Sequence, residues 1–202
     1  MFNLRDFANV VKGIKLIPNT HLRDPNKLIR LWCHEVYRVF YDRLIDDTDR
    51  KSFFSMVKSK CQRFFKVDLS KILFPHMLGG SSVVNDEHLQ SLFFGDYMYP
   101  EVEAKIYDEI PDANLLTKAM EHYLNEHNSV SKGPIPLVMF RFAVEHTSRI
   151  IRIIRQKGGH ALLVGMGGSG RQSLTKLATF IANYELFQIE VNKTYSITAG
   201  NV

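Results

Sequence analysis

A glycine-rich segment near the end of the chain constrains the fold more than any other part of the sequence. A short apolar run, residues 161–164, comes before it, and a helical pattern over residues 173–184 follows it. A second apolar run, residues 186–191, comes next. This order of strand, loop, helix and strand is typical of the opening of a parallel α/β sheet. The sequence therefore predicts two buried strands, with a glycine loop between the first strand and the helix.

The loop has the pattern of a phosphate-binding P-loop. Gly165 and Gly170 match the two glycines of Gly-x-x-x-x-Gly-Lys-Ser/Thr. Glycines suit this loop because its backbone must adopt positive φ angles and direct successive N–H groups at phosphate oxygens. The positive end of the following helix points to the same place. The predicted nucleotide-binding residues are Gly165, Gly167, Gly168, Ser169, Gly170, Arg171, Gln172 and Ser173.

Three features distinguish this loop from the P-loop of an enzyme that hydrolyses ATP. Arg171 takes the lysine position, and its broad guanidinium does not replace the narrow ammonium that slides along the phosphates. Gln172 lacks the hydroxyl that ligates Mg²⁺, and the hydroxyl of Ser173 lies about 100° further round the helix. No apolar strand ending in an acidic pair follows the loop. We therefore predict binding of ATP or ADP, without a dedicated Mg²⁺ ligand and without a catalytic residue.

Two other interpretations of the loop stay open on spacing alone. Gly165, Gly167 and Gly170 also satisfy Gly-x-Gly-x-x-Gly. Glu190 then lies where a dinucleotide-binding fold places the acid that holds the ribose. The third interpretation is a tight turn without a ligand, inside a helical interaction module. The phosphate-directed cation of Arg171 favours the P-loop among the three.

The first third of the chain has the pattern of a small helical bundle over residues 3–66. Asn3, Asp24 before Pro25, and Thr48 are helix-start signals. The second helix is expected to extend to Leu44, because apolar residues recur every three or four positions that far. The side chains expected to face the core are Leu28, Leu31, Trp32, Val36, Val39, Phe40, Leu44, Phe53, Phe54, Val57, Cys61 and Phe64.

The part between this bundle and the loop is less regular. A Gly-Gly-Ser-Ser turn and an aromatic, acidic segment at residues 92–110 carry no clear period, so no element is predicted there. Asp112 begins a helix whose apolar face is expected to hold Leu115, Leu116, Ala119, Met120, Tyr123 and Leu124. A linker with two prolines follows, and a long helix is expected from Leu137 to Gln156.

The positive net charge raises the question of whether the chain binds nucleic acid. The chain carries a net charge of +5, with a pI near 9.2. Basic residues gather just before the loop, at Arg141, Arg149, Arg152, Arg155 and Lys157. No aromatic residues alternate with them and no zinc-ligand spacing occurs, so we expect a solvated or interface helix face and no nucleic-acid site.

Membrane and disulfide chemistry are also not expected. No apolar run approaches the roughly 20 residues that span a bilayer. Cys33 and Cys61 are the two cysteines. Both lie in helical patterns, so we expect half-buried, reduced thiols in a cytosolic compartment.

With these motifs in view, the sequence resembles the dynein heavy chains, specifically the axonemal ones. LLVGMGGSGRQSLTKLA resembles the P-loop of the fourth AAA+ module of the motor ring. LVMFRFAVEHTSRIIRIIRQKGGHALLVG resembles the helix and strand before that loop, and LFFGDYMYPEVEAKIYDEI resembles the connector before the module. Two stretches resemble the helical lid of the third module: FNLRDFANVVKGI and LIRLWCHEVYRVFYDRLIDDTDR.

The resemblance implies a mixed α and α/β fold in three parts. Residues 1–75 would be a helical AAA+ lid, residues 76–135 a connector with a short helix, and residues 136–202 the incomplete start of a P-loop AAA+ parallel-sheet domain. Residues 137–140 would lie over the adenine, which adds Val138 and Phe140 to the predicted cofactor-binding residues. Their alternative role is plain core packing.

The resemblance also implies a role for Arg5. It would match the lid arginine that faces the nucleotide of the third module. The alternative is an arginine at a helix start that pairs with Asp6 or with solvent.

The resemblance implies ATP-driven, microtubule-based movement of cilia or flagella for the intact protein. The fourth module would have a regulatory nucleotide role, with the principal hydrolysis elsewhere in the ring. The implied partners are the rest of the heavy-chain ring, the dynein intermediate and light chains, and microtubules. The implied location is the cytoplasm and cytoskeleton, in the axoneme of a cilium or flagellum.

Overall fold

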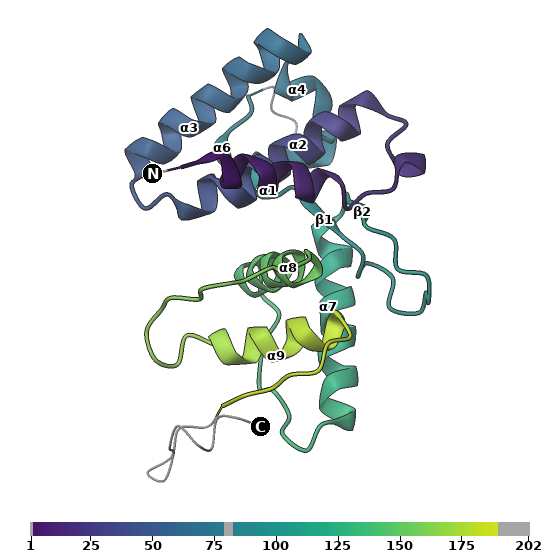
Figure 1. Cartoon of the computed structure of the whole chain (residues 1–202). Coiled ribbons are helices and arrows are strands. Elements are labelled where there is room, and N and C mark those ends of the chain that lie inside the picture. Colours follow the sequence, from purple (N-terminus) through teal and green to yellow (C-terminus); the bar gives the residue numbers. More distant parts are fainter. Residues whose placement is uncertain (1, 79–82, 190–202) are drawn as a thin grey trace.

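The computed structural model describes residues 2–78 and 83–189, and its helices form two groups (Figure 1). The first group contains α1 (Leu4–Ile14), α2 (Pro25–Val39), α3 (Asp47–Lys60), α4 (Leu69–Ile72), α5 (Pro75–Leu78) and α6 (Asp86–Gln90). The second contains α7 (Ala113–Val130), α8 (Arg141–Arg155) and α9 (Arg171–Ile181). Strands β1 (Phe93–Gly95) and β2 (Asp108–Ile110) lie at the junction. No helix in the described ranges is long and apolar enough to cross a membrane.

Side chains cap the first three helices close to the positions that the sequence signals. The Asn3 side chain accepts hydrogen bonds from N–H groups of the first turn of α1. The Asp6 carboxylate accepts one from the Asn3 N–H at 2.8 Å, which completes a capping box. Asp24 caps α2, and Asp46 caps α3 just before the predicted start at Thr48. The three predicted helix starts are confirmed.

The ends of α2 and α3 depart from a regular helix. α2 ends at Val39, before the predicted Leu44, and a 3₁₀ turn over Tyr41–Arg43 follows it. α3 continues into a π-helical turn over Cys61–Phe65. Lys66 then takes a left-handed conformation with φ of 60°. The π turn changes the helical phase of the side chains after Cys61.

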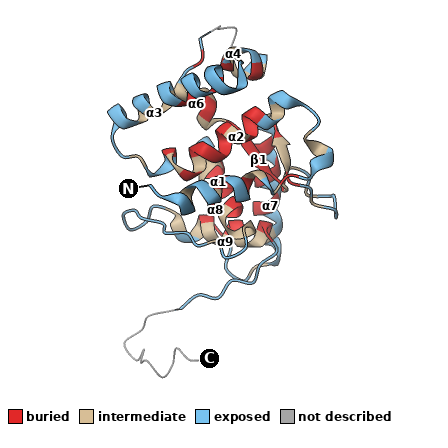
Figure 2. Cartoon of the chain, turned by 45° about the horizontal axis from the view of Figure 1, so that its top comes forward, coloured by how far each residue is buried: buried red, intermediate tan, exposed pale blue. Residues whose placement is uncertain are grey.

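The first group packs its own core around α2 (Figure 2). Cys33 and Cys61 are fully buried in this core, and their Sγ atoms lie 3.8 Å apart as free thiols. The predicted reduced state agrees with this arrangement, but the expected half-burial was wrong. α2 and α3 bring the two thiols together.

Two side chains expected in that core are exposed. Leu28 is 41% exposed, since it lies in the first turn of α2 beside the solvent-facing cap Asp24. Phe64 is 63% exposed because the π turn carries it away from the inner face of α3. Both predictions of burial were therefore wrong.

The second group packs α7, α8 and α9 around a separate core. Leu115 is 49% exposed and lies outside the buried face of α7, so its predicted burial was wrong. α8 begins at Arg141 and not at the predicted Leu137. The preceding segment is extended instead, because Ile135 and Met139 turn inward at alternate positions and are buried in this core.

The predicted parallel sheet does not form within the described residues. Residues 161–164 are exposed and adopt no strand, and residues 186–189 adopt none either. Residues 190 and 191 lie outside the described ranges. A strand needs a hydrogen-bonded neighbour, and the described part of the chain places none beside these segments. The one sheet in that part pairs β1 with β2 antiparallel, in the aromatic segment where no element was predicted.

Candidate functional site

The glycine loop leads into α9 through two left-handed glycines. Gly168 has φ of 78° and Gly170 has φ of 77°, a region that other residues rarely adopt. Gly170 is the N-cap of α9 and provides no side-chain cap. The first backbone hydrogen bond of α9 joins Leu174 N–H to Gly170 C=O at 2.9 Å. The N–H groups of the three preceding residues therefore lack helical acceptors, as an anion site at a helix start requires.

A cavity of about 770 Å³ opens at this helix start. It brings together seven of the predicted nucleotide-binding residues: Gly167, Gly168, Ser169, Gly170, Arg171, Gln172 and Ser173. Gly165 does not line the cavity. A Cβ atom added at Gly165 would lie 3.1 Å from the Ser169 hydroxyl, so the loop folds tightly over this glycine.

The Arg171 guanidinium lies under the loop. It donates hydrogen bonds to the backbone carbonyls of Leu163 at 3.3 Å and Met166 at 3.0 Å. These bonds hold the two sides of the loop together without a ligand. A phosphate group that approaches the loop would compete with these carbonyls for the same cation.

The structure adds residues to this site that the motif did not indicate, among them one cation and one aromatic ring. Lys176 lines the cavity one helical turn after Gln172, so its ammonium shares a face with the loop. Phe187 lines it from the segment after α9. The helical spacing from Gln172 was the signal that could have identified Lys176, whereas nothing local to Phe187 indicates its position.

The structure leaves the predicted adenine-contacting residues outside this cavity. Val138 is 77% exposed and Phe140 is 56% exposed, and neither lines the cavity. The alternative of core packing is therefore wrong for both. Glu190, on which the dinucleotide interpretation depends, lies outside the described residues.

The chemistry of the lining fits phosphate better than a metal ion. Open backbone N–H groups, two cations and the hydroxyls of Ser169 and Ser173 are the groups that bind phosphoryl oxygens. The described lining residues include no carboxylate. Within the described ranges, no cluster of three or more His, Cys, Asp or Glu could hold a metal.

A buried ion pair connects the two groups of helices. Glu35 on α2 is completely buried, and Nε of Arg152 on α8 donates to its two oxygens at 3.1 and 3.0 Å. The guanidinium Nη2 makes a further contact with the same carboxylate. Nδ1 of His34 lies 3.1 Å from Glu35 Oε1, and the Tyr107 hydroxyl donates to the same atom at 3.4 Å. Three segments therefore meet at one carboxylate: α2, α8 and the segment just before β2.

The surroundings of Glu35 keep it charged. Burial by itself raises the pKa of this carboxyl, but the hydrogen bond from His34 and the ion pair with Arg152 outweigh that effect. The resulting pKa is about 2, against an ordinary value of 4.5. Burial also lowers the pKa of His34, so the ring is neutral and its N–H donates to the carboxylate.

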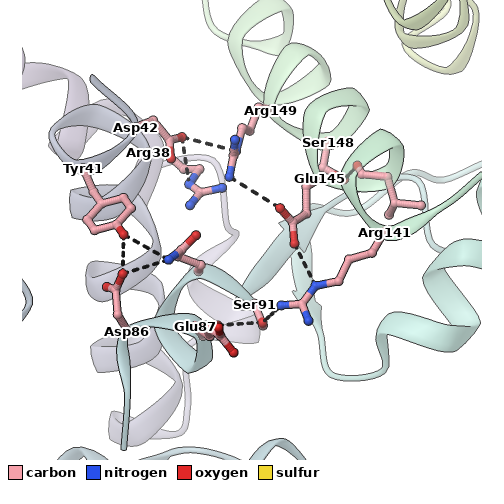
Figure 3. A network of polar contacts seen from close by, with 12 residues as sticks. Arg38, Tyr41, Asp42, Asp86, Glu87, Ser91, Arg141, Glu145, Ser148 and Arg149 are labelled. Atoms are coloured by element: carbon pink, nitrogen blue, oxygen red, sulfur yellow. Dashed lines mark hydrogen bonds and ion pairs between the residues drawn. The ribbon is translucent and has the colours of Figure 1, made fainter. Parts of the chain in front are cut away.

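A second set of polar contacts continues along the same interface (Figure 3). Arg149 on α8 lies between Asp42 after α2, at 3.4 Å, and Glu145 on α8, at 3.7 Å. Glu145 accepts a hydrogen bond from Arg141 at 2.9 Å, and Arg141 donates to the Ser91 hydroxyl after α6 at 2.6 Å. Four of the basic residues before the loop lie on α8 and contact other segments, as expected for an interface helix face: Arg141, Arg149, Arg152 and Arg155. Lys157 follows α8 and is exposed.

Arg5 lies in the first turn of α1, and its side chain is exposed. The Asp6 carboxylate, its suggested partner, pairs instead with Arg43 at 2.7 Å. Arg5 therefore does not pair with Asp6. The solvent-facing position leaves the guanidinium accessible.

Comparisons with known proteins agree with this two-part arrangement. Residues 1–74 match the family described as AAA+ lid domain, and residues 135–199 match P-loop containing dynein motor region D4. The chain is 58% identical over 196 residues to dynein axonemal heavy chain 3 of Mus musculus, covering 97% of this chain and 5% of that protein. It is 58% identical over 201 residues to the Homo sapiens heavy chain 3, again over 5% of its length. It is 46% identical over 198 residues to dynein axonemal heavy chain 12 of Mus musculus, over 6% of its length.

Proposed function

We propose, for a chain that belongs to the axonemal dynein heavy chain family, that its glycine loop binds the phosphates of ATP or ADP. The proposed phosphate-binding residues are Gly165, Gly167, Gly168, Ser169, Gly170, Arg171, Gln172 and Ser173, to which we add Lys176. The observation that carries this proposal is the uncapped start of α9, which opens into a cavity with two cations and no carboxylate among its described lining residues.

We propose that this chain alone does not hydrolyse the nucleotide. Hydrolysis needs a carboxylate that holds the metal and a group that orients water. We propose that bound nucleotide acts through the position of the loop and of α9, which packs on α8 in the second core. Mg²⁺, if it accompanies the nucleotide, would be held by the phosphates and by the hydroxyls of the loop.

The dinucleotide interpretation is the second candidate, and it depends on Glu190. A dinucleotide-binding fold holds the pyrophosphate on the backbone N–H groups at a helix start and requires no cation there. The present site has two cations, Arg171 and Lys176, which favour the P-loop interpretation. The match of residues 135–199 to a P-loop family supports the nucleotide assignment. A loop that binds no ligand is the remaining alternative. It predicts that a folded chain does not bind ADP.

For the intact protein, we propose ATP-driven movement along microtubules in the axoneme of a cilium or flagellum. Its partners would be the rest of the heavy-chain ring, dynein intermediate and light chains, and microtubules. The chain spans about 5% of the length of the relatives it matches, so these are properties of a larger assembly. We also propose residues 1–75 as lid, 76–135 as connector and 136–202 as the start of the nucleotide-binding domain. In that assembly, the exposed Val138 and Phe140 are available to an adenine ring.

Replacing Lys176 with alanine is expected to weaken ADP binding by about tenfold, because a charge-assisted contact to phosphate is lost. The measurement is a fluorescence titration of the purified chain with a fluorescent ADP derivative. Lys118→Ala is the matched control, since Lys118 is an exposed lysine on α7 that does not line the cavity. Equal affinities for the two variants would contradict the assignment of Lys176.

Gly170→Val is expected to reduce ADP binding more than Lys176→Ala does. Valine is strained at φ of 77°, so the loop must change its backbone to accommodate it. Circular dichroism of each variant checks that α9 and the other helices persist. Unchanged ADP affinity in a folded Gly170→Val variant would argue for a binding site elsewhere.

A further inference from the structure

The two cysteines of the chain meet inside the core of the first group of helices. Cys33 lies in the middle of α2, and Cys61 begins the π turn that follows α3. Both side chains are completely buried, and their Sγ atoms lie 3.8 Å apart. A disulfide joins two sulfurs at about 2.05 Å, so these atoms need to approach by only about 2 Å to form one. The contact therefore brings together two oxidisable groups from positions 28 residues apart.

The π turn at Cys61 allows the two sulfurs to approach each other. Among the residues Cys61–Phe65 that form the turn, only Cys61 is buried. Phe65 contacts the ring of Trp32 with centroids 5.3 Å apart, but it remains 39% exposed. Lys66 then ends the turn in a left-handed conformation. Because no second residue of the turn is anchored in the core, Cys61 can shift towards α2 without displacing another buried side chain. Single π turns in helices are frequent at functional sites.

The attachment of α3 to the core determines how an oxidant reaches the thiols. Phe53 and Phe54 are half-buried near the middle of this helix. Beyond them Val57 is the one buried residue up to the end of the helix, and Cys61 follows. An element with few buried apolar contacts opens locally at a lower free energy than the rest of the core. Opening of this second half of α3 exposes Cys61 to small solutes.

The contact between the sulfurs makes the two thiols chemically unequal. The hydrogen bond from Cys33 lowers the pKa of the Cys61 thiol, although burial acts in the opposite direction. The same hydrogen bond raises the pKa of Cys33, and burial raises it further. The thiolate is the form that attacks an oxidant. Cys61 is therefore the nucleophile of the pair, and Cys33 is the thiol that can react with it afterwards.

We propose that Cys33 and Cys61 form a redox-modification site, in which a peroxide converts the two thiols into a disulfide that fixes α3 to α2. Disulfides of this transient kind are the ones found in reducing compartments. A dithiol reverses the change by thiol–disulfide exchange and is itself oxidised to a disulfide. The proposal is independent of nucleotide binding at the glycine loop.

The reaction proceeds in two balanced steps with hydrogen peroxide as the oxidant. The Cys61 thiolate attacks one peroxide oxygen, the O–O bond breaks, and hydroxide leaves, so Cys61 becomes a sulfenic acid. The Cys33 sulfur then attacks the Cys61 sulfur, and the S–O bond breaks. The hydroxyl leaves as water with the proton of the Cys33 thiol. The hydroxide takes up the proton that Cys61 lost, so two thiols are oxidised and one peroxide is reduced to two waters.

Peptide mapping of the purified chain tests the bond directly. The chain would be treated with hydrogen peroxide, alkylated, and digested with trypsin without reduction. We expect residues 31–38 and 61–63 to be recovered as one disulfide-linked pair, which dithiothreitol separates. Cys33→Ala is expected to accumulate a sulfenic acid at Cys61, detected with dimedone, because the second thiol is absent. Cys61→Ala is expected to leave Cys33 reduced at the same peroxide concentration. Circular dichroism checks that both variants are folded.

A pair of neighbouring substitutions tests the opening of α3. Val57→Ala is expected to accelerate disulfide formation by about tenfold, because it removes a buried contact that holds the second half of the helix. Met56→Ala is the matched control, since Met56 is 48% exposed on the same helix, and its rate should stay within about twofold of the wild type. In the oxidised chain, hydrogen exchange of the α3 amides is expected to be at least about tenfold slower.

Three results would overturn the proposal. The first is a folded chain whose two cysteines stay reduced under peroxide treatment that oxidises a cysteine-containing control peptide. The second is oxidation that ends at a sulfenic or sulfinic acid, or that links only separate chains, as the peptide map and non-reducing electrophoresis would show. The third is equal hydrogen exchange of α3 in the reduced and oxidised chains, since the disulfide would then fix nothing. Equal oxidation rates of Val57→Ala and Met56→Ala would contradict access through the opening of α3.

Discussion

The Glu35→Ala variant is expected to lose about 3–5 kcal/mol of unfolding free energy, the typical cost of removing one partner of a buried ion pair. Arg152 would keep its charge inside the interface between α2 and α8, where it is 6% exposed. His34 and Tyr107 would lose a hydrogen-bonding partner as well. Urea unfolding, followed by circular dichroism, measures the change.

A surface ion pair provides the control. Arg43 pairs with Asp6 at 2.7 Å, but its side chain is 52% exposed, so Arg43→Ala is expected to cost about 0–1 kcal/mol. The two variants remove ion pairs of similar length that differ in burial. Equal destabilisation by both would contradict a special role for Glu35.

The pH dependence of stability follows from the same group. The pKa of Glu35 is about 2 in the folded chain, below the ordinary 4.5. A depressed folded pKa gives stability that is complete above the ordinary pKa and is lost as the pH falls towards 2. Glu35→Ala should therefore lose part of the pH dependence of the wild type between pH 4.5 and 2. If the unfolding free energy of the variant depends on pH as that of the wild type does, Glu35 is not the group that causes this dependence.

The Gly13→Ala variant is expected to destabilise the chain by about 2–3 kcal/mol, although alanine normally stabilises a helix relative to glycine. Gly13 is buried on α1, and an added Cβ would lie 1.6 Å from Oε2 of Glu35. The carboxylate has no room to withdraw, because Arg152 holds both of its oxygens. The same unfolding experiment measures the effect.

Two comparisons make this prediction specific. Gly133→Ala is the matched control, since nothing lies within 4 Å of its added Cβ, and it is expected to be neutral or slightly stabilising. The second comparison is a double-mutant cycle with Glu35→Ala. The cost of Gly13→Ala should largely disappear when the carboxylate is already gone. Additive effects in this cycle would show that the clash lies elsewhere.

Local signals predicted the helices well. Asn3 and Asp24 cap helices where the sequence places them, because capping depends on residues within one turn. The ends of helices were harder. The π turn after Cys61 and the extended segment before Arg141 are set by packing against other parts of the chain. The predicted strands failed for a related reason, since a parallel strand depends on distant neighbours.

The candidate site could also be predicted only where local sequence patterns indicate it. The glycine positions and the helix start indicated seven residues that line one cavity. The ion pair of Glu35 with Arg152 joins positions 117 residues apart, and no local pattern links them. No pattern in the sequence distinguishes Glu35 from the other residues of its helix, and Arg152 is one member of a basic cluster. Only the packing of α2 against α8 reveals that they form a pair.

Competition binding at the glycine loop tests the central claim most directly. A fluorescent ADP derivative would be bound to the purified chain and challenged with unlabelled ATP and, separately, with NAD. The account predicts displacement by ATP and none by NAD at the same concentration. Displacement by NAD at similar concentrations, or the absence of ADP binding to a folded sample, would contradict it.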